Sequence, residues 1–142
     1  MNKSAFILDP RIANDTFFLL DAPLCRVGLM DDARFPWLIL VPCVPLVREW
    51  PDLSSIQQVQ LQVEINAAAQ ALQQAFPSGE KLNIAALGNL VPQLHIHVVL
   101  RHVGDAAWPK PVWGVGEREP YSKETALQTS SAIMAFWDLS DD

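Results

Sequence analysis

Two of the chain's three histidines lie in one apolar run, LVPQLHIHVVL over residues 90–100, and a glutamine precedes them. Because side chains alternate between the two faces of a β-strand, an extended segment here would place Gln93, His95 and His97 on one face and the apolar residues on the other. At a rise of about 3.3 Å per residue, neighbours in that row would be about 6.5–7 Å apart. That spacing is too long for direct contact, but a phosphate-sized group can bridge it.

Three interpretations of this row stay open on the residues alone. The first is a solvent-facing polar row with no chemistry. The second is a metal site, which needs a third or fourth ligand. The remaining histidine, His102, would fall on the opposite face of a continued strand, and no recurrent carboxylate spacing replaces it. We therefore predict no metal and no other cofactor. The third is attack on phosphorus by a neutral imidazole, whose ordinary pKa of about 6.5 makes it a competent nucleophile near neutral pH.

The elements that must position the row begin with extended segments. Residues 15–20 and 24–30 have the composition of two strands, and residues 30–34 that of a polar turn. The apolar segment 35–42 follows as a central strand, and two strands joined by a short polar turn predict a hairpin. Prolines then end the central strand, because proline cannot donate to a sheet ladder.

One long helix is predicted over residues 53–76, which contain neither glycine nor proline, with Asp52 or Ser54 as its N-cap. At 100° per residue its apolar side chains fall on two nearly opposite faces. These faces consist of Ile56, Val59, Val63 and Ala67, and of Leu61, Ile65, Leu72 and Phe76. One face would cover the sheet. The other would contact a second subunit in a homodimer, or the thick core of a monomer.

After this helix the chain alternates again. We predict strands over residues 81–88 and 93–101, paired antiparallel across a turn at 89–92, then a tryptophan-rich loop and a second helix over residues 122–138. Strands, long helix, strands and helix indicate an α+β fold. We expect a single domain over residues 1–142, with an antiparallel sheet of about five strands, one long helix between the sheet halves and a C-terminal helix.

Composition narrows the class of protein. Half of the 142 residues are hydrophobic and 18% are charged, so disorder is not expected. A net charge of −6 argues against binding to a nucleic-acid backbone. Cys25 and Cys43 lie alone in apolar runs, which is typical of buried thiols in a reducing compartment. The apolar run at residues 5–8 is too short for a signal peptide, and proline breaks the most apolar window, so we expect no membrane partner and a cytoplasmic location.

The segment QLHIHVV resembles the signature of the histidine triad (HIT) superfamily, His-φ-His-φ-His-φ-φ with φ apolar, but Gln93 stands in place of the first histidine. The similarity extends over about residues 14 to 110. It includes the apolar strand PWLILVP, the long helix after it, and the exit RHVGDAAWP. The resemblance implies a HIT-like fold and a nucleotidyl hydrolase or transferase acting on phosphoanhydrides or phosphoramidates.

The same resemblance implies roles for the row. His95 would attack the α-phosphate and form a covalent nucleotidyl-histidine that water hydrolyses, with its other ring nitrogen held by an acceptor such as a backbone carbonyl. His97 would donate to a phosphoryl oxygen and stabilise charge in the transition state. Gln93 can position an oxygen but cannot carry a proton, so the source of the leaving group's proton is open.

Three further residues are candidates for substrate binding: Asn89 in the turn before the row, Arg34 in the hairpin turn, and Trp108 after the row. Each has a plainer interpretation, as a turn residue or as a loop tryptophan packed on the core. We expect hydrolysis of a dinucleoside polyphosphate such as diadenosine tetraphosphate, or of a phosphoramidate. We also expect the protein to be a homodimer and its binding partner to be this small nucleotide substrate. The alternatives are a HIT-like nucleotide-binding protein with little turnover and a metal-binding protein.

Overall fold

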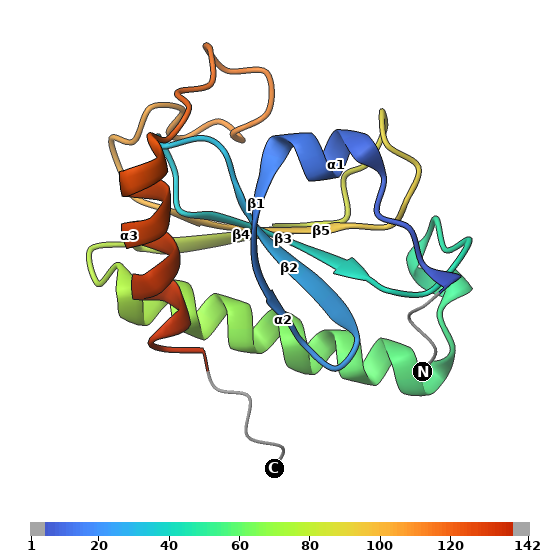
Figure 1. Cartoon of the computed structure of the whole chain (residues 1–142). Coiled ribbons are helices and arrows are strands. Elements are labelled where there is room, and N and C mark those ends of the chain that lie inside the picture. Colours follow the sequence, from blue (N-terminus) through green and yellow to red (C-terminus); the bar gives the residue numbers. More distant parts are fainter. Residues whose placement is uncertain (1–4, 138–142) are drawn as a thin grey trace.

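The computed structural model describes residues 5–137, which form one five-stranded antiparallel sheet with helices on both faces (Figure 1). The strand order is β1-β2-β3-β5-β4. The elements along the chain are α1 (Pro10–Asp15), β1 (Thr16–Asp21), β2 (Cys25–Met30), β3 (Trp37–Pro42), a 3₁₀ turn (Trp50–Asp52), α2 (Ser55–Ala75), β4 (Lys81–Ala85), β5 (Ile96–Arg101) and α3 (Lys123–Met134). The predicted α+β class, the strand number and the place of the long helix are confirmed.

Helix α2 begins at Ser55, two residues later than predicted, and its N-cap is Ser54, one of the two predicted caps. The Ser54 hydroxyl accepts a hydrogen bond from the Gln57 backbone N–H at 3.2 Å, and the Gln57 side chain accepts from the Ser54 N–H at 2.8 Å. This capping box satisfies two of the N–H groups that a helix start leaves unpaired. The helix ends at Ala75, two residues before Pro77, which cannot continue it.

Only one apolar face of α2 packs on the sheet. Leu61 and Leu72 are fully buried there. The opposite face leaves Ile56, Val59 and Val63 exposed by 84%, 63% and 54%. The chain itself therefore does not cover the second predicted face over residues 5–137, and its proposed contact with a second subunit stays a prediction.

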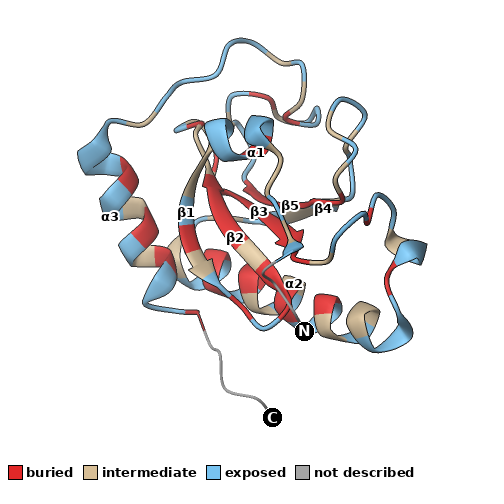
Figure 2. Cartoon of the chain, turned by 45° about the vertical axis from the view of Figure 1, so that its right-hand side comes forward, coloured by how far each residue is buried: buried red, intermediate tan, exposed pale blue. Residues whose placement is uncertain are grey.

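The sheet has a hydrophobic core on each face, which is why all residues of β3 and β5 are buried (Figure 2). On the side of α2 the core includes Leu38 and Val98. On the other side it includes Trp37, Ile39 and Val99. Central strands buried on both faces read as continuous apolar runs, and a polar residue on either face is then exceptional. His97 is such a residue.

The second face of the sheet is covered by α1 and by two long connections, residues 86–95 and 102–122 (Figure 1). Helix α1 was not predicted. Asp9 caps it, because its carboxylate accepts the Arg11 backbone N–H at 2.9 Å, and Pro10 occupies the first helical position. Six residues are too short to show a helical periodicity, so the Asp9-Pro10 pair is its one sequence signal.

Two strands and one helix are shorter than predicted. β4 ends at Ala85 instead of residue 88, and β5 begins at Ile96 instead of Gln93. The pairing of β5 with β3 stops at Ile96, and the Leu94 N–H donates instead to the Val47 carbonyl in the loop after β3, at 3.0 Å. Helix α3 covers Lys123–Met134, and residue 138, the predicted end, lies outside the described residues.

Candidate active site

The two histidines lie on the sheet face opposite α2, at the start of β5. His97 is paired with Ile39 of β3, and His95 lies just before the strand. Their ring centroids are 5.1 Å apart in an edge-to-face arrangement. The prediction that His95 and His97 are too far apart for direct contact is therefore wrong. The backbone is no longer a regular strand at His95, so the residue spacing of an ideal strand does not apply there.

His95 is oriented by its own chain. Its Nδ1 lies 2.7 Å from the Gln93 carbonyl oxygen. A carbonyl only accepts, so Nδ1 carries the hydrogen and Nε2 keeps its lone pair. The predicted hold by a backbone carbonyl is confirmed. Gly88 lies against the ring, since a Cβ at that position would be 2.8 Å from His95 Cε1. Only a residue without a side chain fits this close approach of loop and ring.

His97 has both ring nitrogens occupied. The indole Nε1–H of Trp37 donates to Nδ1 at 3.1 Å, and Nε2 lies 2.8 Å from the Leu87 carbonyl oxygen. Because an indole N–H only donates and a carbonyl only accepts, these partners select the neutral tautomer with its hydrogen on Nε2. Burial lowers the pKa of His97, the hydrogen bond to the Leu87 carbonyl raises it and His95 beside it lowers it, so that the pKa is about 4. The Nε2–H of His97, which was expected to donate to a phosphoryl oxygen, here donates to the Leu87 carbonyl oxygen.

Tryptophan rings surround this histidine. The Trp37 and Trp113 ring centroids lie 5.8 and 5.0 Å from that of His97, and the two indoles meet edge to face at 6.1 Å. With Met30 and Ile12 of α1 they line a cavity of about 240 Å³, which we call the apolar chamber. The sequence singled out Trp108, but the tryptophan that this loop places at the cavity is Trp113, five residues later.

A second cavity, also of about 240 Å³, opens on the other side of His95. We call it the polar chamber, because Arg48, Glu49, Asn89 and Gln93 line it. His95 lines both chambers. A histidine that lines both an apolar and a polar compartment is suited to bind a substrate that has a flat apolar part and a charged part.

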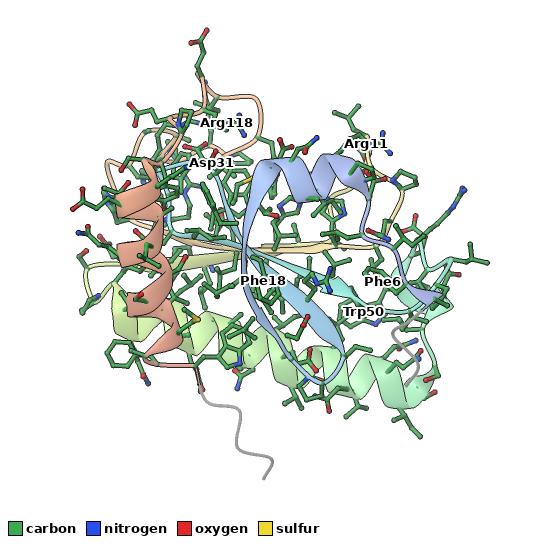
Figure 3. All side chains as sticks on the ribbon, in the orientation of Figure 1. Phe6, Arg11, Phe18, Asp31, Trp50 and Arg118 are labelled. Carbon is green, nitrogen blue, oxygen red and sulfur yellow. The ribbon has the colours of Figure 1, made fainter. Side chains whose placement is uncertain are left out.

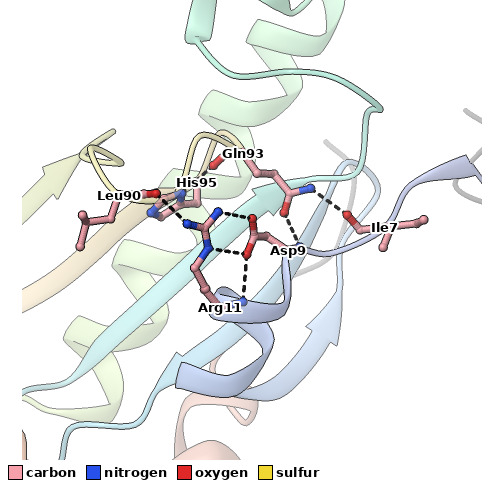
Figure 4. Close-up of polar contacts among 6 residues, drawn as sticks. All are labelled: Ile7, Asp9, Arg11, Leu90, Gln93 and His95. Carbon is pink, nitrogen blue, oxygen red and sulfur yellow. Dashed lines mark hydrogen bonds and ion pairs between the residues drawn. The ribbon is translucent and has the colours of Figure 1, made fainter.

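The Gln93 side chain does not extend the histidine row. Its amide donates to the Ile7 carbonyl at 2.9 Å and accepts from the Asp9 N–H at 2.9 Å (Figure 4). The predicted row of three is therefore wrong at Gln93, because the strand begins only at Ile96. The amide instead ties the segment before α1 to the loop that carries His95.

Arg11 continues this connection. It lies on α1 on the side of the 86–95 loop (Figure 3). Its guanidinium donates to the Asp9 carboxylate at 2.9 Å and to the Leu90 carbonyl at 3.0 Å. The hydrogen bonds from Arg11 lower the pKa of Asp9. The N-terminal segment thus forms one wall of the site, which the sequence did not predict.

The other predicted binding residues are spread around the site. Asn89 is exposed and lines both chambers. Arg34 donates to the Asp32 carboxylate at 2.8 Å and to the Val115 carbonyl at 2.7 Å, and lines an outer opening of about 500 Å³ next to the apolar chamber. Asp31 lies in the same turn, with Arg118 nearby (Figure 3).

Trp108 lies at the far end of β5. Its ring is 5.7 Å from the guanidinium carbon of Arg101. Arg101 is itself buried and donates to Asp105 at 2.7 Å. Trp108 is not among the residues that line the two chambers. Trp108 therefore packs on Arg101, in agreement with the plainer interpretation of a loop tryptophan packed on the rest of the chain.

Within residues 5–137, no three histidine, cysteine, aspartate or glutamate side chains are grouped so that they could hold a metal ion. In the same range no helix has the length and hydropathy needed to cross a membrane.

A family model described as the HIT domain matches residues 11–104. Among solved structures, a histidine triad protein from Sinorhizobium meliloti 1021 is 41% identical, with a TM-score of 0.92 over 95% of this chain and 99% of the other. One from Bradyrhizobium japonicum is 44% identical, with a TM-score of 0.90 over 94% and 98%. One from Marinobacter aquaeolei VT8 is 42% identical, with a TM-score of 0.89 over 93% and 96%. None of the curated proteins matches this chain.

Proposed function

The chain belongs to the HIT domain family, and from this we propose that it binds a nucleotide and transfers the nucleotidyl group to His95 as the first half of a hydrolysis. The observation that carries the proposal is the orientation of His95. Its Nδ1 is held at 2.7 Å by the Gln93 carbonyl while the ring lies between the two chambers. An imidazole whose far nitrogen is fixed in this way has its lone pair on Nε2, ready to attack phosphorus.

The reaction has two steps. Nε2 of His95 attacks the α-phosphorus, the bond to the leaving group breaks, and the leaving group takes the electron pair. This gives a nucleotidyl-imidazolium that keeps its hydrogen on Nδ1, bonded to Gln93. Water then attacks phosphorus, the P–N bond breaks, and the electron pair returns to Nε2 while the proton lost by water passes to the solvent. Both steps leave the carbonyl contact of His95 intact, so the ring does not need to reorient.

The two chambers suggest how the substrate lies. The indoles of Trp37 and Trp113 offer edges and faces to a nucleobase in the apolar chamber. The leaving group would then occupy the polar chamber, where Asn89 and the amide side of Gln93 are within the lining. Arg34 at the outer opening would contact the nucleoside from the far side. His97 would donate to a phosphoryl oxygen once Nε2–H leaves the Leu87 carbonyl.

A second candidate is a nucleotide-binding protein with little turnover. The observation in its favour is that both nitrogens of His97 already have partners. A structural neighbour from Sulfolobus tokodaii strain7, named a hypothetical histidine triad nucleotide-binding protein, shares the fold at 13% identity. Under this alternative, AMP would bind tightly while no substrate is consumed.

Hydrolysis assays separate the two functions. We expect purified protein to release mononucleotide from diadenosine tetraphosphate, and we expect His95→Ala to abolish release. If wild type and His95→Ala are equally inert on diadenosine tetraphosphate and on adenosine phosphoramidate while AMP binds by calorimetry, the binding function holds. If AMP does not bind either, both proposals fail.

We also propose that the chain forms a homodimer through the exposed apolar face of α2, Ile56, Val59 and Val63. Light scattering on the wild type should give twice the chain mass. Val59→Asp should then give the monomer mass, whereas Gln62→Asp, an exposed helix position of the same chain, should not.

A further inference from the structure

The leaving group in the proposed reaction must depart with an electron pair, and how basic it is decides whether it needs a proton. A phosphate oxyanion leaves an anhydride without one. An amine leaving a phosphoramidate is far more basic and departs only when protonated, a task that enzymes give to a general acid of suitable pKa. The question is which group in this site could supply that proton.

Gln93 cannot supply it. An amide has no titrating proton near neutral pH. In addition, its nitrogen donates to the Ile7 carbonyl and its oxygen accepts from the Asp9 N–H, both at 2.9 Å. The position that the family signature gives to a histidine is thus occupied by a group that holds the N-terminal segment.

His97 cannot supply it either. To be an acid near neutral pH it must first become an imidazolium, with hydrogens on both nitrogens. Its Nδ1 lies 3.1 Å from the indole Nε1 of Trp37, whose hydrogen already points at it. A second hydrogen on Nδ1 would meet the first head-on, and burial beneath the indoles removes the water that would solvate the charge.

The other charged residues that line the two chambers are Arg11, Asp15, Arg48 and Glu49. Guanidinium groups do not release their protons in proteins. The Asp15 carboxylate forms an ion pair with Arg118 at 3.6 Å, and the Glu49 side chain accepts the Asp52 backbone N–H, so both already act as acceptors. Of the residues between 5 and 137 that line the chambers, this leaves His95, whose Nδ1 hydrogen is bonded to the Gln93 carbonyl and whose Nε2 is the nucleophile.

We propose that this site works without a general acid, and that it therefore selects nucleotides whose leaving group departs as a weakly basic oxyanion, which means phosphoanhydrides over phosphoramidates. This inference rests on the proposed function. In the step, the N–P bond forms as the P–O bond breaks, and the electron pair stays on the leaving oxygen, so no proton is transferred. The leaving group of a phosphoramidate cannot depart in this way, because its nitrogen would have to leave as an amide anion.

The experiment compares leaving groups on one nucleotide. Steady-state kcat/KM is measured at neutral pH for diadenosine tetraphosphate, for adenosine 5′-phosphoramidate, and for a series of AMP aryl esters whose phenols differ in acidity. Because a general acid typically contributes about 10²–10⁴-fold, we expect the anhydride to exceed the phosphoramidate by at least about 10²-fold. Within the aryl series the rate should fall steeply and continuously as the phenol becomes more basic.

Two variants probe the missing acid directly. Gln93→His returns a titratable group to this position, and we expect it to raise kcat/KM for the phosphoramidate relative to the anhydride. Gln93→Ala breaks the same hydrogen bonds to Ile7 and Asp9 without adding an acid, so it controls for the loosened segment and should not change that ratio.

The outcomes are separable. If the wild type consumes neither an anhydride nor an activated aryl ester, the proposed function fails and the inference fails with it. If the wild type hydrolyses the phosphoramidate as fast as the anhydride, or if the rate is independent of phenol acidity while chemistry limits the rate, the proposed function stands and the inference is overturned.

Discussion

The indole Nε1–H of Trp37 donates to Nδ1 of His97 at 3.1 Å, and this one bond decides what His97 can do. It leaves the imidazole neutral, with its single hydrogen on Nε2, where it donates to the Leu87 carbonyl oxygen at 2.8 Å. Trp37 pairs with Val99 in the sheet, so it is a diagonal neighbour of His97 on the same face. Trp37 therefore acts as a positioning residue for His97.

Replacing Trp37 by Phe tests that relationship, because it keeps an aromatic ring but removes the donor. The donor stabilises neutral His97, so its loss should raise the pKa of His97 from about 4. A hydrogen bond worth about 1 kcal/mol corresponds to a rise of about 0.7. Nitrogen-15 NMR of the imidazole should show the Nε2–H tautomer in both proteins, because the Leu87 carbonyl still accepts that hydrogen, and protonation of His97 at a higher pH in Trp37→Phe. An unchanged pKa of His97 in the variant would contradict the role of Trp37.

The low pKa of His97 also predicts how stability depends on pH. Its folded-state value, about 4, lies below the ordinary 6.5, so between these values the unfolded chain binds more protons. The contribution of His97 is then complete above pH 6.5 and is lost as pH falls towards 4, by up to about 3 kcal/mol. Urea unfolding at intervals from pH 7.5 to 4 measures this loss.

His97→Asn provides the control for the pH series, because it removes the titrating group and should flatten the decline. Carboxylate groups change the stability of the protein at lower pH than His97 does. Burial raises the pKa of Asp105, but the hydrogen bonds and charge of Arg101, together with hydrogen bonds from the backbone N–H groups of Ala107 and Trp108, bring the pKa to about 2. A folded value below the unfolded one gives stability that is lost only below about pH 4. A decline between pH 6.5 and 4 of equal size in both proteins would contradict the assignment to His97.

Gln93→Ala should release the N-terminal segment. The amide makes two hydrogen bonds to the backbone of Ile7 and Asp9, each worth about 1 kcal/mol. Amide exchange at Asp9 should therefore speed up by about tenfold or more, while the exchange of β3 changes little. Gln62→Ala, at an exposed position of α2, is the matched control. Equal protection of Asp9 in the variant and wild type would show that the amide does not hold the segment.

Gly88→Ala should displace His95, the proposed nucleophile, without unfolding the chain. The new Cβ would lie 2.8 Å from Cε1 of His95 and 2.8 Å from the Val91 carbonyl oxygen. Relieving that overlap moves either the ring or the loop, and a misplacement of about 1 Å can cost about 10²-fold in rate. We expect a large loss of turnover with a circular dichroism spectrum like that of wild type. Full activity in this variant would mean that the ring and Gly88 do not meet during the reaction.

Much of the fold could be predicted from local sequence patterns. The Ser54 cap, the hairpin of β2 and β3 and the carbonyl hold on His95 all depend on residues close in sequence or on a strong alternation. The boundary of β5 could not be predicted, because Leu94 leaves the strand to pair with Val47 in a distant loop. That single irregular turn redirects Gln93 and brings the two imidazoles into contact.

The walls of the site depend on contacts between distant parts of the chain. Gln93 meets residues 84 and 86 positions earlier, in a segment too short for periodicity to reveal. Trp37 and Trp113 read as ordinary apolar residues of a strand and of a loop, and only the sheet register and the path of the loop place them on His97. The hydrogen bond that orients His95 is local and was predictable, whereas the surroundings of His95 were not.

The most direct test of the account is mass spectrometry of the protein mixed briefly with diadenosine tetraphosphate and quenched. We expect a mass increase of one adenylyl group, mapped by fragmentation to His95, and its absence in His95→Ala. An adenylyl group on any other residue, or rapid hydrolysis by wild type with no adduct on His95 at any quench time while His95→Ala stays active, would contradict it.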